Sequence, residues 1–358
     1  MVNVLGLDIG GANTKASFLT TKNGTVQEHK NVLQYFPVWK SGKNGLSTVL
    51  QKIKQTLTGS TLLDAVAVTI TAELSDAYQT KKEGINHVLD AVCQVFGESK
   101  VLVLDVDANL LQVNQARTAP LRVSSANWAA TGWMVSQLFK NGVVIDVGST
   151  TTSIIPVVNG KVAAWGKTDL EKLQNGELVY TGSLRTNVAA IVNGIPIRGV
   201  MARVSSELFA QSGDVHLILG NITEQDYTAE TVDGREKTKN SAYARLARVV
   251  CADTDMLSTQ EIEEMAQYVY RKQVEQISEG LKQVYCRTKT HTKEQVAVVT
   301  GFGRNFLAKK AAQTVGFTKV VDLQQLLGSE ACVVSPSVGV ALLAASRLEG
   351  KNVEWMQC

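Results

Sequence analysis

The sequence GLDIGGANTK, residues 6–15, decides the fold, because a near-copy, IDVGSTTTS, returns at residues 145–153. The aspartate, a glycine and a threonine of the first copy recur in the second with unchanged spacing. An apolar run precedes each copy, and an Asn-Gly pair follows each, Asn23-Gly24 and Asn159-Gly160. Asn-Gly is the strongest short-range signal for a two-residue hairpin. Each half is therefore predicted to run strand, glycine turn, strand, hairpin turn, strand.

The residue types of the two turns indicate phosphate binding. Glycines and small hydroxyl residues let successive backbone N–H groups approach a polyanion, and an aspartate at a strand end can bind a cation. A single Asp-x-Gly turn is also an ordinary turn, but duplication with matched flanks favours a clamp for a phosphate chain and its Mg²⁺. Asp8 and Asp146 are the predicted metal ligands and catalytic carboxylates. The predicted phosphate-binding residues are Gly10, Gly11, Asn13, Thr14, Lys15, Gly148, Ser149, Thr150 and Thr151.

A third element, VAVVTGFGRNFL at residues 296–307, reads as a strand, a turn with Gly301 and Gly303, and a helix. With the two loops it resembles the actin-like ATPase superfamily of actin, the Hsp70 ATPase domain, and sugar and acetate kinases. The resemblance implies an α/β, ribonuclease H-like fold with two duplicated α/β domains around a central cleft, and adds both glycines to the phosphate-binding set. The third loop departs from the superfamily pattern because Phe302 separates its glycines.

The resemblance also gives domain boundaries. The first domain is expected at residues 1–123 plus 336–358, and the second at residues 124–335. The least generic stretch, about 165–253, is expected to be an insertion that determines the substrate.

Composition narrows the class of protein. A chain of 358 residues with 44% hydrophobic residues can form two packed cores. A net charge of +3 and the lack of a clustered basic stripe argue against nucleic-acid binding. No signal peptide or membrane-spanning run is evident, so a cytoplasmic protein is expected. The five cysteines lack zinc spacing and are expected to be reduced and mostly buried: Cys93, Cys251, Cys286, Cys332 and Cys358.

Two carboxylates, Glu73 and Asp76, follow the apolar strand predicted at residues 64–71. Open α/β sheets build their sites at the carboxyl ends of strands, so both are candidate catalytic residues. The alternative is a solvated turn or helix cap. Helical periodicity predicts helices at residues 46–57, 83–96, 124–139, 243–253, 259–284 and 333–347.

Four residues are candidates for substrate contact. Two lie at the start of the helix predicted at residues 124–139, and two lie in irregular segments of the expected insertion, where binding residues concentrate. For an isolated arginine the alternative is a surface salt bridge, and the arginines of the helix at 243–253 are expected on its solvated face. The four candidates are Asn127, Trp128, Arg185 and Asp233.

A closer resemblance spans almost the whole chain. It is carried by the two loops together with TITAELSDAY (69–78), SSANWAATG (124–132), YTGSLRTNV (180–188) and YARLARVVCAD (243–253). In this order the motifs resemble the hydantoinase/oxoprolinase-related proteins of the tetrahydromethanopterin-linked one-carbon pathway, which include the condensing enzymes of methanofuran and methylofuran biosynthesis.

This resemblance implies a transferase that joins an aminomethyl-furanmethanol diphosphate to γ-glutamyltyramine, forming an aryl ether and releasing diphosphate. Lys15 would neutralise the diphosphate, Thr14, Ser149 and Thr150 would donate to its oxygens, and Glu73 or Asp76 would orient the phenol. Mg²⁺ is the implied cofactor, and the binding of ATP or ADP is left open. The expected partners are these two small molecules, without nucleic acid or membrane, and the sequence is compatible with a homodimer.

Three other functions remain open at this point. The same loops hold ATP in small-molecule kinases and phosphotransferases. A hydantoinase-like amidohydrolase would couple ATP to ring opening, although such enzymes use longer chains or a second subunit. A non-catalytic nucleotide switch would need an interaction surface, and no long exposed apolar segment is evident.

Overall fold

The computed structural model, which describes residues 1–41, 45–289 and 295–355, begins with strand β1 (Val2–Gly10). Its residues from Val4 to Ile9 are buried on both faces, as expected for the centre of a sheet. β1 pairs antiparallel with β2 and parallel with β4, in the sheet order β3-β2-β1-β4-β5-β6. The other strands of this sheet are β2 (Asn13–Lys22), β3 (Thr25–Tyr35), β4 (Ala65–Thr71), β5 (Val101–Leu104) and β6 (Leu110–Gln112).

A second sheet repeats this order with later segments. Its order is β10-β8-β7-β13-β14, so β7, which enters the second glycine turn, lies beside β8 and β13 as β1 lies beside β2 and β4. The sequence prediction of a duplicated, actin-like ATPase fold is therefore confirmed. The strands are β7 (Gly142–Val147), β8 (Thr152–Val158), β9 (Lys161–Val162), β10 (Leu178–Val179), β13 (Val296–Thr300) and β14 (Val320–Asp322).

Both Asn-Gly pairs form the predicted hairpin turns. Asn23 and Gly24 have φ values of 54° and 81° between β2 and β3, and Asn159 and Gly160 have 52° and 71° between β8 and β9. Positive φ at both central positions defines a type I′ turn, for which Asn-Gly is the preferred sequence.

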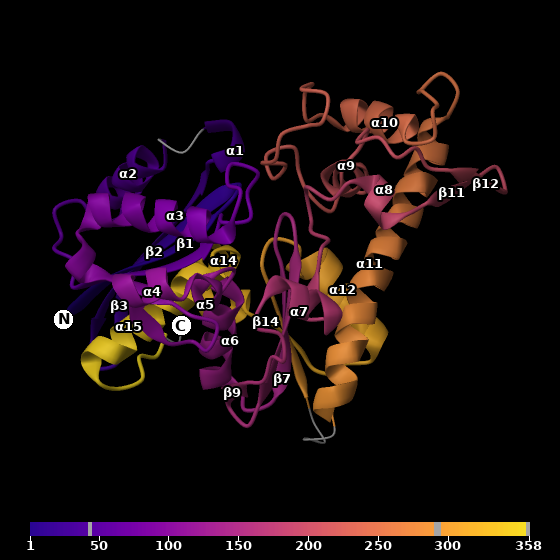
Figure 1. The fold of residues 1–358 in the computed structure, drawn as a ribbon. Helices are drawn as coiled ribbons and strands as arrows, with labels where there is room; N and C mark the ends of the chain where they lie inside the picture. Colours follow the sequence, from indigo (N-terminus) through magenta and orange to yellow (C-terminus); the bar gives the residue numbers. More distant parts are fainter. Residues whose placement is uncertain (42–44, 290–294, 356–358) are drawn as a thin grey trace. The chain divides into compact units, whose positions relative to one another are not determined.

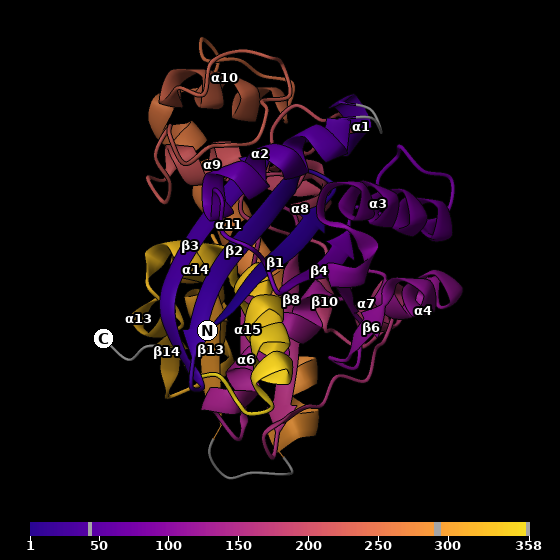
Figure 2. The same cartoon turned by 90° about the vertical axis from the view of Figure 1, so that its left-hand side faces the viewer.

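Helices cover both faces of the first sheet. Leu5, Leu7 and Ile9 pack in one core with the buried faces of α2 (Leu46–Thr58) and α3 (Lys81–Phe96). The opposite face is covered by α15 (Ser335–Glu349), which Figure 2 shows lying along β1. A Cβ at Gly6 would lie 2.1 Å from the Ser337 carbonyl oxygen, so glycine is required for this close approach. Further helices of this part are α1 (Val38–Ser41), η2 (Glu98–Lys100), α4 (Val113–Thr118), α5 (Pro120–Val123), α6 (Asn127–Leu138), α7 (Asp169–Gln174), α13 (Gln324–Leu327) and α14 (Ser329–Val333).

The long helix α11 (Thr259–Lys289) joins two cores (Figure 1). Its second half, through Ile277 and Leu281, packs with β7 and β13. Its first half, through Ile262 and Met265, packs with the expected insertion, which has a small core of its own. The other elements here are α8 (Val188–Ile191), β11 (Gly194–Ile197), β12 (Val200–Arg203), α9 (Ser212–Ile218), α10 (Lys239–Arg248), η3 (Arg304–Ala308) and α12 (Lys309–Val315).

The chain divides into two compact units whose boundaries differ from the predicted domains. The first unit comprises Met1–Gly142, Ile155–Lys172 and Val321–Cys358, and the second comprises Val143–Ile154 and Leu173–Val320. Helix α6, predicted as part of the second domain, belongs to the first unit because it packs against α15.

Two smaller expectations are corrected. Helix α10 does not expose all its arginines, because Arg245 is completely buried. Cys332 is buried, as expected for most of the cysteines, but Cys251 and Cys286 are exposed. Cys358 lies outside the described residues.

Among the residues that the structure describes, no helix is both long and apolar enough to cross a membrane.

Candidate functional site

In the first loop, an ion pair joins the two strands that flank the glycine turn. Asp8 on β1 lies directly opposite Lys15 on β2, so both side chains point to the same face of the sheet. Lys15 Nζ lies 3.2 Å from Asp8 Oδ2, and Asp8 is only 3% exposed. Burial raises the pKa of Asp8 above its ordinary value, and the positive charge of Lys15 acts against this shift. The loop thus holds a cation beside a carboxyl group that has little contact with water.

Buried oxygens beside this pair suit a metal ion. Asp8 Oδ1 and the hydroxyl of Thr69, its neighbour on β4, are buried without a hydrogen-bond partner in the part of the chain that the structure describes. Mg²⁺ prefers oxygen ligands and is usually held by one or two carboxylates with water and substrate phosphates. Among the described residues, no group of three or more His, Cys, Asp or Glu side chains could hold a metal ion.

Thr14 is separated from this face. It lies opposite Ile9, one position from Lys15, so strand alternation directs it to the other face of the sheet. Its hydroxyl is buried and has no hydrogen-bond partner among the described residues. The structure therefore brings Lys15, but not Thr14, to Asp8.

A second polar group of the first unit, here called the Glu73 cluster, consists of Glu73, Lys81, Ser124, Ser125 and Asp169. Glu73 Oε1 lies 2.5 Å from the Ser124 hydroxyl, 2.7 Å from the Ser125 hydroxyl and 3.7 Å from Lys81 Nζ. Glu73 is 1% exposed, and burial raises its pKa against the hydrogen bonds of the two serines and the charge of Lys81.

The two candidate carboxylates after β4 thus differ sharply. Glu73 is buried in the cluster, whereas Asp76 is exposed. The local sequence after the strand does not distinguish them. It also gives no signal for the other members of the cluster, Lys81, Ser124, Ser125 and Asp169, because only the fold brings these residues together.

In the second unit, three separate segments meet at the second loop. Gly148 O accepts from both the backbone N–H (2.9 Å) and the hydroxyl (2.9 Å) of Ser183, and Ser149 O accepts from Arg185 N at 2.9 Å. A Cβ at Gly182 would lie 2.6 Å from the Thr150 backbone, so only glycine fits. The segment YTGSLRTNV thus holds the second loop in shape through its backbone.

The third glycine turn also reaches this loop. A Cβ at Gly301 would lie 2.5 Å from Asp146 Oδ1, and Gly303 N donates to Val147 O at 2.9 Å. Gly301 and Gly303 therefore lie beside the second loop, and that they bind phosphate remains a prediction.

A buried network behind the segment was not foreseen. Gln273 on α11 donates its side-chain amide to Thr181 Oγ1 at 2.9 Å and to Gly182 O at 2.7 Å. Its amide oxygen lies 3.0 Å from His216 Nε2, which must therefore carry the hydrogen. Burial lowers the pKa of His216 to about 4, so the imidazole is neutral at pH 7.

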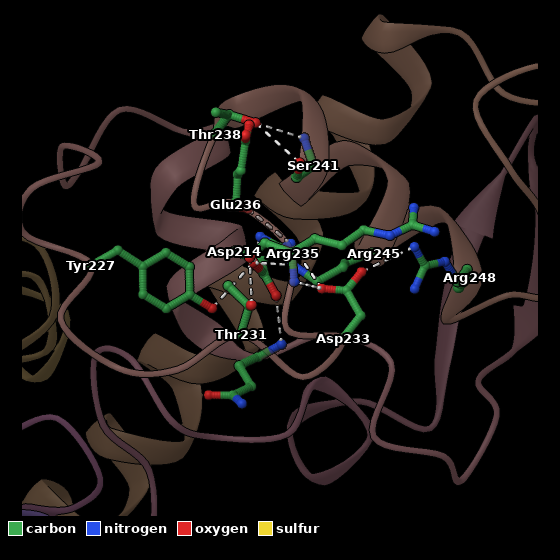
Figure 3. A network of polar contacts seen from close by, with 11 residues as sticks. Asp214, Tyr227, Thr231, Asp233, Arg235, Glu236, Thr238, Ser241, Arg245 and Arg248 are labelled. Carbon is green, nitrogen blue, oxygen red and sulfur yellow. Dashed lines mark hydrogen bonds and ion pairs between the residues drawn. The ribbon is translucent and has the colours of Figure 1, made fainter.

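The predicted substrate residues have structural partners. Asn127 Oδ1 accepts from the backbone N–H of Trp128 at 2.9 Å, and the Trp128 ring is buried 4.5 Å from Lys172 Nζ. Figure 3 shows Asp233 between two arginines, at 3.3 Å from Arg245 Nη1 and 3.2 Å from Arg248 Nη2. The structure gives Asp233 the role of anchoring its loop to α10. Contact with substrate remains a prediction for all four candidates, including Arg185.

Comparison with known proteins places the chain in a family. A family model described as Hydantoinase/oxoprolinase matches residues 64–347, which is most of the chain. The chain belongs to the hydantoinase/oxoprolinase family. This family member is 38% identical over 349 residues to the (4-{4-[2-(gamma-L-glutamylamino)ethyl]phenoxymethyl}furan-2-yl)methanamine synthase of Methanocaldococcus jannaschii, covering 97% of this chain and 99% of that protein.

One further sequence and one solved structure are also similar to this chain. A protein of the same name from Methanococcus vannielii is 35% identical over 214 residues, covering 59% of this chain and 94% of that protein. The nucleotide-free structure of acetone carboxylase, from a study of ATP-dependent acetone carboxylation, has a TM-score of 0.56 at 9% identity over 95% of this chain and 70% of that chain. The structural likeness shows a shared fold.

Proposed function

We propose that this protein joins an aminomethyl-furanmethanol diphosphate to the phenolic oxygen of γ-glutamyltyramine, forming an aryl ether and releasing diphosphate. The observation that carries the proposal is the similarity to the Methanocaldococcus jannaschii synthase, which is 38% identical over 97% of this chain. The name of that synthase describes a furan-methanamine linked through a phenoxymethyl group, which is the product of this condensation.

The reaction releases diphosphate, a leaving group with a large negative charge that the protein must stabilise. The bond between the furan-methyl carbon and diphosphate breaks, the bond from that carbon to the phenolic oxygen forms, and the phenolic proton is released. An electron-rich furan stabilises positive charge at the methyl carbon, so the remaining barrier depends on stabilising diphosphate. Lys15 offers a cation for this purpose on the face of the first loop.

Asp8 and Asp146 are the residues that we propose hold Mg²⁺, each within its own unit. Asp8 fits this role because its Oδ1 is buried without a hydrogen-bond partner among the described residues. When bound, Mg²⁺ would neutralise charge on the leaving diphosphate. The other proposed phosphate-binding residues are Gly10, Gly11 and Asn13 in the first loop and Gly148, Ser149, Thr150 and Thr151 in the second loop.

Glu73 is the proposed acceptor of the phenolic proton. A phenol has a pKa near 10, so a carboxyl oxygen that can accept its proton assists its attack. Burial raises the pKa of Glu73, and its Oε2 has no hydrogen-bond partner among the described residues. Asp76, by contrast, is exposed to solvent.

The test is mass spectrometry of purified protein incubated with Mg²⁺, the furan diphosphate and γ-glutamyltyramine, with and without ATP. We expect the ether and free diphosphate without ATP, because the balanced reaction consumes none. Absence of ether, with ATP loss that depends on a small molecule, would replace the proposal with a kinase or an ATP-coupled amidohydrolase.

Single substitutions test which of these residues take part in the reaction. D8N, D146N and E73Q are each expected to lower kcat by at least about 100-fold, in the range of acid–base and electrostatic contributions. E28Q, which changes an exposed carboxylate on β3, serves as the matched control. Full activity of D8N and D146N would overturn the role of the loops, and a larger loss in D76N than in E73Q would reassign the base.

A further inference from the structure

The hydroxyl of Ser125 lies between two carboxyl groups. Its Oγ is 2.7 Å from Glu73 Oε1 and 2.7 Å from Asp169 Oδ2. A hydroxyl has one hydrogen, so it can donate to only one of these oxygens. If both carboxyl groups were ionised, the other contact would place two oxygens 2.7 Å apart without a hydrogen between them. The geometry therefore requires one additional proton in the Glu73 cluster.

The surrounding contacts place this proton on Glu73. Lys81 Nζ forms an ion pair with Asp169 Oδ2 at 3.3 Å and lies farther, at 3.7 Å, from Glu73 Oε1. Ser124 Oγ accepts from Lys81 Nζ at 3.1 Å and donates its one hydrogen to Glu73 Oε1. All of these contacts are then satisfied when Glu73 Oε1 donates to Ser125 and Ser125 donates to Asp169.

The two ends of this hydrogen-bond chain differ in their access to water. Glu73 is 1% exposed, whereas the side chain of Asp169 is 20% exposed. The other carboxyl oxygen, Glu73 Oε2, is buried and lacks a hydrogen-bond partner in the described part of the protein. One end thus offers a free acceptor inside the protein, and the other reaches solvent.

We propose that Ser125 relays a proton from Glu73 to Asp169 when the phenol attacks. The phenolic proton moves to Glu73 Oε2, the proton on Glu73 Oε1 moves to Ser125 Oγ, and the Ser125 hydrogen moves to Asp169 Oδ2. Glu73 remains a neutral acid throughout, and Asp169 gains the proton and later releases it to water. This inference rests on the proposed function for the source of the proton, but the resting hydrogen-bond pattern does not.

The backbone fixes Ser125 in this position. Its φ is 51°, a left-handed conformation that is uncommon for serine. Its backbone N–H donates to Ile70 O at 2.9 Å, at the end of β4. Because glycine adopts this φ without strain, S125G removes the hydroxyl while keeping the backbone. S124A is the matched control, since Ser124 contacts Glu73 but not Asp169.

Other titratable groups must be included in any pH experiment. Burial raises the pKa of Tyr78 to about 12. Its hydroxyl lies 2.6 Å from His87 Nδ1. The titratable and charged groups to follow around Glu73 are Tyr78, Lys81, Glu83, His87 and Asp169.

The first test observes the resting protein. Side-chain carboxyl ¹³C NMR over a pH series is expected to show Glu73 protonated at the assay pH and its titration coupled to that of Asp169, with E73Q and D169N giving the assignments. S125G should abolish the coupling, and S124A should retain it. Independent titration of the two carboxyls in the wild type, or unchanged coupling in S125G, would overturn the relay.

The second test measures turnover. S125G and D169N are expected to lower kcat by about 100-fold with little change in KM and to shift the pH profile, in the range of acid–base contributions. Formate, a small proton acceptor, should restore part of the D169N activity, which it would not do for a structural defect. Full activity in S125G would overturn the relay. If the wild type makes no ether, the proposed function fails, while the NMR experiment still decides whether Ser125 connects the two carboxyls.

Discussion

Arg245 donates through Nε to Asp214 Oδ1 at 2.8 Å, and neither side chain reaches solvent. Tyr227, also buried, donates its hydroxyl to the same oxygen at 3.1 Å. Arg245 extends the network to Asp233, which fixes the loop before α10 (Figure 3). A buried pair of this kind is costly to break because the remaining charge has no partner.

R245L is therefore expected to lower the free energy of unfolding by about 3–5 kcal/mol, because it leaves Asp214 buried and uncompensated. Urea unfolding followed by circular dichroism measures the loss. The double variant D214L/R245L should recover part of the stability, since it removes both charges. R198A, which breaks the exposed pair with Glu261, is the control and should cost little. Stability of R245L equal to that of R198A would contradict the role assigned to the pair.

The buried position of His216 leads us to expect that the free energy of unfolding decreases in acid. Burial lowers its folded-state pKa to about 4 from an ordinary value of 6.5. Between these pH values the unfolded chain binds a proton that the folded protein does not. Its contribution to the free energy of unfolding therefore decreases as pH falls, by up to about 1.4 kcal/mol per pH unit.

Urea unfolding at several pH values between about 7 and 4 isolates this contribution by comparing the wild type with H216Q. The difference in unfolding free energy between the two proteins should change with pH across this window, because glutamine at position 216 does not titrate. H29Q, which changes an exposed histidine on β3, is the matched control. Parallel pH dependences for the wild type and H216Q would show that His216 is not held neutral by the fold.

Gln273 predicts a link between α11 and the second loop. Q273E replaces the amide that donates to Thr181 and Gly182 with a carboxylate, which can only accept when ionised. The variant is expected to lose about 1–3 kcal/mol of stability, the cost of unsatisfied buried groups. Q267E, at an exposed position of the same helix, should leave stability nearly unchanged. Equal thermal-unfolding curves for the two variants would exclude the link.

The regular elements of this fold were predictable because each depends on local signals. The strand around Asp8, the Asn-Gly turns and the capping box of α11, in which Glu261 accepts from Ser258 N at 2.8 Å, follow from short sequence patterns. These patterns also placed each of the two duplicated glycine loops correctly between two strands.

The polar interior was not predictable in the same way. Arg245 occupies a helix rich in polar residues and was expected in solvent, because its partner Asp214 lies 31 residues away. Lys81 meets Asp169 across 88 residues, and Gln273 meets Thr181 across 92. Such pairs depend on how α3, α10 and α11 pack, and no periodicity in the sequence encodes that packing.

Lys15 predicts how the first loop binds an anion. Because its ammonium group lies 3.2 Å from buried Asp8, the pair has almost no net charge without a ligand. Binding of Mg²⁺ at Asp8 would release the cation of Lys15 for the diphosphate, so the two ligands should bind cooperatively. K15Q is expected to weaken binding of inorganic pyrophosphate by about 10-fold or more, in the range of charge-assisted hydrogen bonds.

Calorimetric titration of inorganic pyrophosphate, with and without Mg²⁺, measures this effect on the full-length protein. The wild type should bind more tightly with Mg²⁺, D8N should lose most of that gain, and K15Q should bind weakly in both conditions. K22Q, at an exposed lysine on β2, controls for net charge. Equal losses in K15Q and K22Q would show that only the overall charge matters, whereas a Mg²⁺ effect that survives D8N would move the metal site away from the first loop.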